Sequence, residues 1–332
     1  MPFDPGIFRN SDVLVTGGLG FIGSALARRL LGLGAKVTLV DSLIPEYGGN
    51  RFNIHDIQDR VTVDLADVRD SQAMTRLIKG RAFLFNLAGQ TSHLDSMTDP
   101  LTDLNINAAA QLSILEACRL HNPGVRIVFA STRQVYGRPD YLPVDEEHPL
   151  NPVDVNGINK LAGEWYHLLY SKIHKIRACA LRLTNTYGPG MRVKDARQTF
   201  LGIWIRRLID GDAIQIYGDG RQRRDFNFID DVIDALLVCA GDEAANGEVF
   251  NVGYSDSISL EELARMLVRL NGGGDFKLIP FPPDREMIDI GDYYADFKKI
   301  RGALGWSPKI ALEDGLARTL KFYRENHAHY WP

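Results

Sequence analysis

Cysteine is scarce in this chain of 332 residues. Its three cysteines, Cys118, Cys179 and Cys239, lie far apart among apolar residues, and no Cys-x-x-Cys spacing occurs. A disulfide framework needs an ordered set of cysteines, and a cysteine-based metal site needs closely spaced pairs. The sequence therefore predicts core thiols in a reducing compartment, with the cytoplasm as the default location, and no metal site.

Long apolar runs and an excess of charge are also missing. No apolar run is long enough to span a bilayer, and residues 1–10 lack the basic-then-apolar pattern of a signal peptide. The formal charge is only −4, which gives no reason to expect nucleic acid or an anionic membrane as a partner. Hydrophobic residues make up 45% of the chain, so we expect a large core in one domain or two coupled ones.

The first half of the chain alternates short apolar runs with amphipathic segments of helix length, which is typical of a parallel sheet with crossover helices. The expected strands are 13–16, 36–40, 60–63, 82–86, 126–130 and 178–183. The expected helices are 21–31, 71–78, 101–120, 158–172, 198–210, 230–240 and 312–324. We predict an α/β fold: a doubly wound parallel Rossmann sheet at 1–184 and a smaller C-terminal α/β substrate lobe at 185–332, partly interleaved.

A glycine-rich turn follows the first expected strand and opens the first expected helix. Gly17, Gly20 and Gly23 have the spacing Gly-x-x-Gly-x-x-Gly. Such a turn lets the backbone approach a pyrophosphate, to which the helix N-terminus offers free N–H groups. Asp41 ends the next strand, where a carboxylate can bind both ribose hydroxyls and repel a 2′-phosphate. The pattern predicts NAD as cofactor; the alternative is a flavodoxin-like glycine turn that binds no dinucleotide.

From Val13 to about Tyr323 the chain resembles the extended short-chain dehydrogenases/reductases, within the family of NAD-dependent sugar-nucleotide epimerases and dehydratases. Besides the glycine turn, the matching segments include Asp-Val-Arg-Asp at 67–70, Asn-Leu-Ala-Gly-Gln at 86–90 and Lys-Leu-Ala-Gly-Glu at 160–164. An asparagine that supports the active site matches Asn107. The resemblance implies NAD contacts from Gly17, Gly20, Phe21, Ile22, Gly23, Asp41, Asp67, Val68, Leu87, Ala88, Gln90 and Lys160.

The same resemblance locates the catalytic positions and shows two departures from the family. Thr132 matches the residue that hydrogen-bonds the reacting hydroxyl, and Lys160 matches the lysine that holds the nicotinamide ribose. The catalytic tyrosine of Tyr-x-x-x-Lys is replaced by Asn156, whose amide cannot take up a proton at neutral pH. Arg133 and Gln134 stand where 4,6-dehydratases have an Asp–Glu acid/base pair, so a standard 4,6-dehydratase is not expected.

Three interpretations of the missing tyrosine stay open. In the first, another group is the base, and His93, Tyr136, Asp154 or Lys160 acting through water are the candidates. In the second, the hydride chemistry is slow or limited to a substrate that supplies its own acid or base. In the third, the chain binds NAD and a sugar nucleotide without converting them. His93 follows the fourth expected strand in a loop that faces the substrate in this family, although a lone histidine is more often structural.

The C-terminal half resembles the family's substrate lobe. Asn185 opens Asn-Thr-Tyr-Gly-Pro at 185–189, and Arg224 lies in Gly-Asp-Gly-Arg-Gln-Arg-Arg-Asp-Phe at 218–226; the resemblance assigns both to the nucleotide diphosphate. Arg285 is a candidate second clamp, since a guanidinium suits paired phosphate oxygens. Asp292 makes an acidic sugar a less expected substrate.

We therefore expect an NAD-dependent enzyme acting on a nucleotide-diphosphate sugar, an epimerase that oxidises the sugar transiently. A dehydratase (lyase) with a non-standard acid/base pair and a catalytically silent binding protein are the alternatives. The helices expected at 101–120 and 158–172 match the family's dimer helices, so the resemblance also implies a homodimer.

Overall fold

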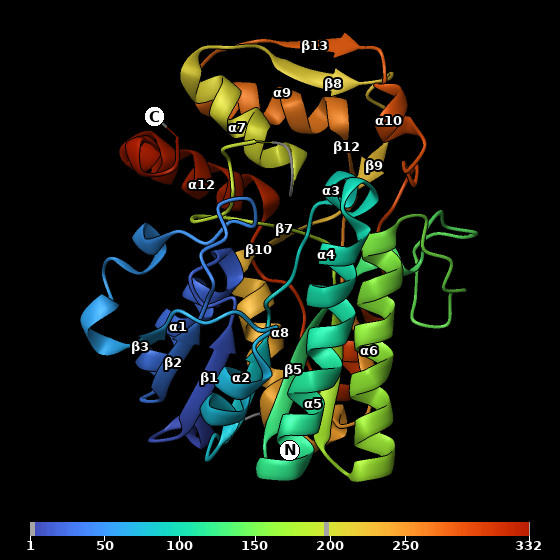
Figure 1. The fold of residues 1–332 in the computed structure, drawn as a ribbon. Coiled ribbons are helices and arrows are strands. Elements are labelled where there is room, and N and C mark those ends of the chain that lie inside the picture. Colours follow the sequence, from blue (N-terminus) through green and yellow to red (C-terminus); the bar gives the residue numbers. More distant parts are fainter. Residues whose placement is uncertain (1–3, 196–198, 332) are drawn as a thin grey trace.

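The computed structural model describes residues 4–195 and 199–331, and a sheet of seven strands forms its centre (Figure 1). Its strand order is β11-β6-β5-β4-β1-β2-β3, and every neighbouring pair is parallel. The strands are β1 (Asp12–Thr16), β2 (Lys36–Val40), β3 (Thr62–Asp64), β4 (Phe83–Asn86), β5 (Arg126–Thr132), β6 (Arg177–Leu183) and β11 (Val249–Val252). Central strands such as β4 are buried along their whole length, as expected when helices cover both faces.

Helices cover both faces of this sheet (Figure 1). One face carries α1 (Phe21–Gly32) and α8 (Ile229–Gly241), which contact each other. The other carries α2 (Ser71–Ile78), α5 (Ala110–His121) and α6 (Val155–His174), packed in that order. The apolar side chains between the layers form two large buried clusters, one for each face of the sheet. The α/β fold with a doubly wound parallel sheet is confirmed.

A smaller lobe lies above the carboxyl ends of the strands in Figure 1. Its described residues form three two-stranded sheets and three main helices. The strands pair as β7 (Asn185–Tyr187) with β10 (Phe226–Phe228), β9 (Arg223–Arg224) with β12 (Ile258–Ser259), and β8 (Ile214–Tyr217) with β13 (Phe276–Ile279). The helices are α7 (Phe200–Asp210), α9 (Leu260–Asn271) and α12 (Leu312–Asn326), with the shorter α10 (Pro283–Glu286) and α11 (Lys298–Leu304). Because α8 and β11 return to the large sheet, the two parts interleave; the boundary after residue 184 stays a prediction.

The prediction of a single helix at 101–120 was wrong. The structure divides it into α4 (Pro100–Leu104), a π-helical turn (Asn105–Ala109) and α5. A π-turn inserts an extra residue, which a search for a uniform spacing of 3.6 cannot detect. Within this turn the Nδ2 of Asn107 donates to the carbonyl oxygen of Gln90 at 2.9 Å, so the irregular turn faces the loop after β4.

Other differences concern element ends and short elements. The strand expected at 60–63 begins at Thr62, because a 3-10 turn occupies Gln58–Arg60. The helix expected at 198–210 corresponds to α7, which begins at Phe200. Residue 198 lies outside the described residues. The sequence did not predict the short helix α3 (His93–Thr98) or helix α9. Nowhere in 4–195 or 199–331 does a helix combine the length and apolar character needed to cross a membrane.

Candidate functional site

A cavity opens at the carboxyl edge of the sheet, where the strand order reverses between β1 and β4. Segments that follow β1, β2, β3, β4, β5 and β6 all contribute to its wall. Parallel α/β sheets bind ligands at such a reversal, because the loops on either side of it diverge and leave a crevice. The cavity is therefore where the predicted cofactor and substrate residues have to meet.

The glycine turn forms one end of this cavity. Gly17 has φ +68°, which favours glycine, and a Cβ there would lie 3.1 Å from the backbone of Ala88. A Cβ at Gly23 would lie 2.2 Å from the carbonyl oxygen of Gly17. Gly20 precedes α1, and no side chain caps the first N–H groups of this helix. These N–H groups can therefore bind an anion, and the space left by the absent Cβ atoms fits a pyrophosphate.

Replacement of Gly23 by alanine is expected to lower NAD affinity at least tenfold. The added methyl group would overlap the Gly17 carbonyl at 2.2 Å, so the glycine turn itself has to move. Gly32→Ala is the matched control, because it lies in the same helix and a Cβ there meets no atom within 4 Å. Isothermal titration calorimetry with NAD measures both variants. Equal affinity in Gly23→Ala and Gly32→Ala would contradict the assignment of this turn to the cofactor.

Two carboxylates mark the continuation of the site toward β2 and β3. Asp41 lines the cavity and accepts hydrogen bonds from the backbone N–H groups of Leu19 at 3.0 Å and Leu43 at 2.8 Å. Burial raises the pKa of Asp41, and these two N–H groups oppose the rise. Asp67 forms an ion pair with Arg69 at 2.6 Å, and this hydrogen-bonded partner lowers the pKa of Asp67. Both carboxylates line the same cavity as the glycine turn.

Most of the predicted cofactor residues lie together on the cavity wall. The wall includes Gly17, Gly20, Phe21, Ile22, Gly23, Asp41, Asp67, Val68, Leu87, Ala88 and Lys160. Gln90 does not line it. Its Oε1 instead accepts from the backbone N–H of Ser92 at 2.6 Å, and its Nε2 donates to the Ser92 carbonyl oxygen at 3.0 Å. The side chain of Gln90 thus shapes the loop before α3.

The four predicted catalytic residues, Thr132, Asn156, Lys160 and His93, also line the cavity. Lys160 follows Asn156 by one turn of α6, and its Nζ donates to the carbonyl oxygen of Ala130 at 2.9 Å. Burial lowers the pKa of Lys160 to about 8, although the charge of Asp103 opposes this change. An ammonium group at this depth can hold a polar ligand group firmly because little water competes with it.

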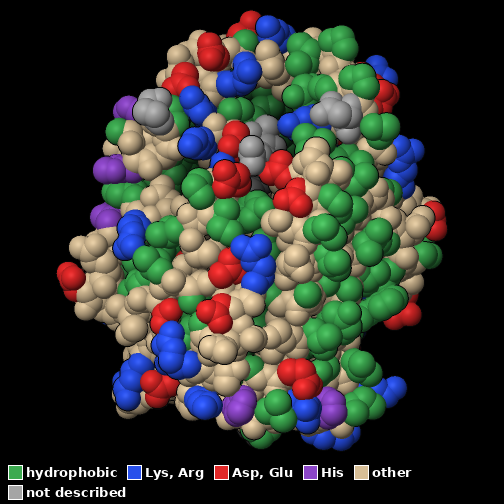
Figure 2. All heavy atoms as spheres, in the orientation of Figure 1, with side chains coloured by type: hydrophobic (Ala, Val, Ile, Leu, Met, Phe, Trp, Pro, Cys, Tyr) green, Lys and Arg blue, Asp and Glu red, His purple; other side chains and the backbone are tan. Residues whose placement is uncertain are grey.

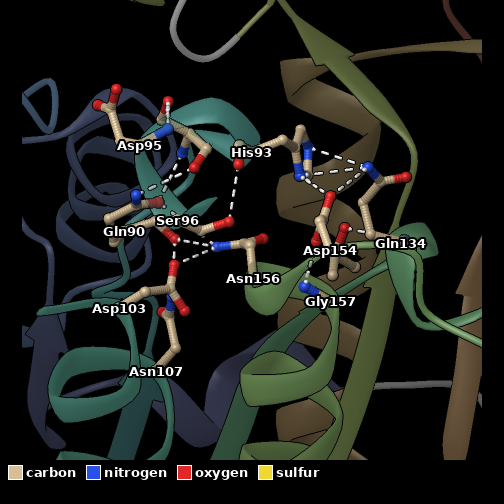
Figure 3. Close-up of polar contacts among 12 residues, drawn as sticks. Gln90, His93, Asp95, Ser96, Asp103, Asn107, Gln134, Asp154, Asn156 and Gly157 are labelled. Carbon is tan, nitrogen blue, oxygen red and sulfur yellow. Dashed lines mark hydrogen bonds and ion pairs between the residues drawn. The ribbon is translucent and has the colours of Figure 1, made fainter. Parts of the chain in front are cut away.

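Asn156 belongs to a buried network on one side of the site (Figure 3). Its Nδ2 donates to the carbonyl oxygen of Gln90 at 2.8 Å and to Oδ2 of Asp103 at 3.0 Å. Asn159 donates to Oδ1 of Asp103 at 2.8 Å, and the Asp103 side chain is fully buried. Both hydrogens of the Asn156 amide are therefore committed to the protein. The sequence reading missed Asp103 and Asn159.

His93 lies on the other side of the site, against Asp154 and Gln134 (Figure 3). Its Nδ1 is 2.9 Å from Oδ2 of Asp154, and Gln134 Nε2 is 3.2 Å from each ring nitrogen. Oδ1 of Asp154 caps α6 by accepting from the backbone N–H of Gly157 at 2.6 Å. Burial would raise the pKa of Asp154, but His93 and this N–H group outweigh burial and hold it below its usual value. Asp at a helix N-cap is a common sequence signal that could have placed Asp154 here.

Tyr136 is removed from the candidate bases. Its side chain is fully buried, its hydroxyl donates to Oδ1 of Asn251 at 2.7 Å, and it accepts from Nη1 of Arg182 at 2.7 Å. Burial raises the pKa of this phenol. Tyr136 does not line the cavity, so it cannot reach a substrate there. The spacing from Thr132 to Tyr136 in the sequence could not show on which side of the strand end the ring packs.

The predicted substrate residues are divided between the cavity and its surroundings. Asn185 lines the cavity, and its Nδ2 donates to the carbonyl oxygen of Asp225 at 2.9 Å. Arg224 is buried behind the wall, where its Nη1 donates to the carbonyl oxygens of Gly291 and Arg223; burial lowers its pKa to about 10. Arg285 lies 5.6 Å from the ring centre of Tyr217 and does not line the cavity.

Several polar atoms around the cavity lack partners. Among the described residues, Oε1 of Gln134, Nη1 of Arg133 and Oγ1 of Thr186 are buried without a hydrogen bond, and all three residues line the cavity. Buried polar atoms are nearly always satisfied, and a polar ligand in the cavity would supply the missing partners. A hydroxyl-rich or phosphorylated molecule has suitable donors and acceptors.

Comparison with known proteins agrees with this geometry. A model of the NAD dependent epimerase/dehydratase family matches residues 13–253. A putative UDP-glucose 4-epimerase of Methanocaldococcus jannaschii is 33% identical, covering 95% of this chain and 99% of the relative. A dTDP-glucose 4,6-dehydratase of Streptomyces niveus is 32% identical, and the match covers 96% of this chain and 95% of the relative. The structure of a Thermus thermophilus UDP-glucose 4-epimerase in complex with NAD superposes with a TM-score of 0.85 at 28% identity. This match covers 95% of this chain and 99% of the epimerase chain. The chain belongs to the NAD-dependent epimerase/dehydratase family.

Proposed function

We propose that this protein is an NAD-dependent epimerase of a nucleotide-diphosphate sugar. One observation carries the proposal: a single cavity joins the glycine turn and Asp41 to Thr132, Lys160 and Asn185. Bound NAD would accept a hydride from a carbinol carbon of the sugar and return it within one turnover. The protein's residues hold both partners in register and exclude water between them.

The roles that we propose for individual residues combine the family resemblance with their places on the wall. The hydroxyl of Thr132 is directed to the reacting sugar hydroxyl, and Lys160 orders the ribose next to the nicotinamide. Asn185 and Arg133, whose Nη1 has no partner among the described residues, would bind the diphosphate and sugar from the cavity wall. Arg224 supports this region from behind, because its guanidinium fixes the backbone at Gly291. Asn156 stands four residues before Lys160, at the position where the family carries its catalytic tyrosine.

Elimination of water is the second candidate, because a 4,6-dehydratase is among the relatives. The expected acid pair is absent at Arg133 and Gln134, so elimination would need another acid and base from the wall. A protein that binds NAD and sugar nucleotide without reaction is the third candidate. The three differ in product mass and in the fate of carbon-bound hydrogen.

A screen in D₂O distinguishes them. The purified protein is incubated with NAD and UDP-, dTDP-, CDP- and GDP-sugars, and products are followed by proton NMR and mass spectrometry. Epimerisation gives two stereoisomers of unchanged mass without deuterium on carbon, since the returned hydride is the one removed. A product lighter by one water would identify elimination instead. Binding without conversion would contradict the epimerase and support the silent protein.

The second copy of this chain is the partner that we propose for α5 and α6. These helices pack side by side, and hydrophobic side chains gather on that side of the molecule (Figure 2). The exposed apolar residues on α4, α5 and α6 are Leu101, Leu104, Leu112, Leu120, Ile158, Trp165, Leu169 and Ile173. On α6 they recur at helical spacing along one stripe, which a matching stripe of a second copy would cover. The free, buried cysteines fit the predicted cytoplasmic location.

Trp165→Asp is expected to convert the dimer to a monomer at micromolar concentration. The substitution places a charge at the middle of the exposed stripe, where the second copy would bury it without a partner. Leu278→Asp is the matched control, since Leu278 is about as exposed but belongs to β13 in the small lobe. Light scattering coupled to size exclusion measures both. A wild-type chain that already has the mass of one monomer would contradict the proposed dimer.

A further inference from the structure

We infer that His93, oriented by Asp154, takes up and returns the proton of the reacting sugar hydroxyl, in place of the tyrosine that the family carries at position 156. The inference rests on the proposed function and assigns its acid/base step. It makes His93 a catalytic residue and Asp154 a positioning residue.

The place of His93 satisfies the first requirement of a general base, which is access to the substrate. It begins α3, whose Ser92 cap accepts from the backbone N–H of Asp95 at 3.1 Å, so the backbone at His93 is held by a formed helix turn. His93 lines the same cavity as Thr132. Its side chain is 30% exposed, whereas that of Asp154 is 0% exposed. The histidine is thus the member of the pair that a substrate can reach.

The contact with Asp154 satisfies the second requirement, which is a defined ring state. Nδ1 lies 2.9 Å from a buried carboxylate oxygen, so Nδ1 carries the hydrogen and Nε2 carries the lone pair. The Gln134 amide nitrogen lies 3.2 Å from this Nε2, and a substrate hydroxyl would replace it as the donor there. The carboxylate cannot rotate away, because Oδ1 of Asp154 is held by the N–H of Gly157. The same carboxylate stabilises the imidazolium once a proton has arrived.

An independent observation points to a hydroxyl ligand beside the ring. Gln134 is more than nine-tenths buried, packs its Nε2 against His93, and leaves Oε1 without a partner in the described residues. A sugar hydroxyl bound between Thr132 and His93 would have neighbouring hydroxyls that can donate to this oxygen. Gln134 would then bind a substrate hydroxyl through Oε1, although it cannot act as the acid that dehydratases carry at this position.

The other candidates are less suited to the step. Asn156 has no titratable group, and both hydrogens of its amide are committed. Tyr136 faces away from the cavity. Lys160 is 5% exposed and donates to the Ala130 carbonyl, which leaves it as an anchor rather than a proton acceptor.

The step balances as follows. The O–H bond of the sugar breaks and its proton moves to Nε2 of His93, while the hydrogen on the same carbon leaves with its electron pair for the cofactor and a carbonyl group forms. On return of the hydride to the opposite face, Nε2 gives the proton back to oxygen. No proton is gained or lost over the turnover.

Substitution of His93 tests the inference with readouts that a purely structural role would not change. His93→Gln and His93→Ala are expected to lower kcat by 10²–10⁴-fold, with NAD and sugar-nucleotide affinities within about threefold of the wild type. Added imidazole should raise the kcat of His93→Ala at least tenfold, because imidazole can occupy the space that the histidine ring leaves. Asp154→Asn keeps a side chain that caps α6 and should lower kcat without response to imidazole. His121→Ala, at an exposed histidine of α5, is the control and should keep full activity.

The outcomes separate the inference from the function on which it rests. If the wild type epimerises a sugar nucleotide and His93→Gln has the same kcat, the role of His93 is overturned and the proposed epimerase function is retained. Loss of NAD binding in parallel with the loss of rate would also overturn it, since His93 would then be structural. If the wild type converts no sugar nucleotide, the proposed function fails and the acid/base role fails with it. The wild-type His93 NMR signals provide a check without turnover, because they should shift when a UDP-sugar binds and stay unchanged if His93 is remote from it.

Discussion

Replacement of Arg182 by methionine is expected to destabilise the protein by about 3–5 kcal/mol. Its guanidinium lies 2.6 Å from Oε1 of Glu164, and the side chains are 5% and 0% exposed. Nε of Arg182 also donates to Oε2 of Glu164 at 3.0 Å, and Ser131 donates to the same oxygen at 2.6 Å. Removal of the cation leaves a buried carboxylate that keeps one hydroxyl donor and no charge partner. Such an unpaired charge costs more than the pair contributes when intact.

Urea denaturation of the wild type and the variant measures this loss as a change in the free energy of unfolding. Arg265→Met is the matched control, because Arg265 pairs with Glu261 on the surface of α9, where such pairs contribute about 0–1 kcal/mol. The double variant Arg182→Met/Glu164→Leu should recover much of the stability, since no buried charge remains. A loss below about 1 kcal/mol in Arg182→Met would show that water reaches Glu164.

This ion pair also bears on the site. Ser131 immediately precedes Thr132, and Tyr136, which accepts from Arg182, ends the turn that carries Arg133 and Gln134. The network therefore anchors the segment that presents these side chains to the cavity.

Local features of the fold were predictable because their causes are local. The strand at 36–40 and the helix at 71–78 have the expected ends. The helix is fixed by its own Asp70, which caps it, and by an apolar stripe with buried Met74 and Leu77. The glycine turn and Asp41 were identified for the same reason, since a turn next to a strand end determines its own geometry.

The polar interior of the site was not predictable, because it joins distant segments. Asp103 meets Asn156 across 53 positions of the chain, while Leu101 and Leu104 on the same helix are exposed. An apolar pattern alone would place those leucines inside and the aspartate outside. The π-helical turn that follows rotates the helix out of the expected phase. This inverted pattern is explained if the exposed leucines belong to the proposed interface with a second copy, while Asp103 binds the amides of Asn156 and Asn159 on α6.

The position of Arg224 illustrates a different limit. Its motif identifies a diphosphate-binding segment by resemblance, but a motif does not specify where a side chain points. In the structure the guanidinium binds backbone carbonyls behind the cavity and lies 3.8 Å from Asp289. Arg133 lines the cavity and its Nη1 has no partner among the described residues, so it is better placed to bind an anion.

Asn156→Tyr is expected to reduce both stability and turnover instead of restoring a standard active site. Asn156 is 2% exposed, and its two amide hydrogens bind the Gln90 carbonyl and Asp103. A phenol has one hydrogen to donate and a larger volume, so Asp103 would keep only the Asn159 donor. Loss of a hydrogen bond to a charged group costs about 1.5–3 kcal/mol, and overpacking costs about 1–3 kcal/mol more. We therefore expect a loss of about 3 kcal/mol or more.

Urea denaturation and the epimerisation assay together test this expectation. Lys321→Tyr introduces the same ring at an exposed position of α12, away from the proposed dimer helices, and should leave both readouts unchanged. A stable Asn156→Tyr variant with faster turnover would mean that the network around Asp103 tolerates the family's tyrosine, and that the wild type lost its base without replacing it. A destabilised and slower variant means that the amide at 156 is now required by Asp103. The proton transfer then has to take place elsewhere on the cavity wall, where His93 is the accessible candidate.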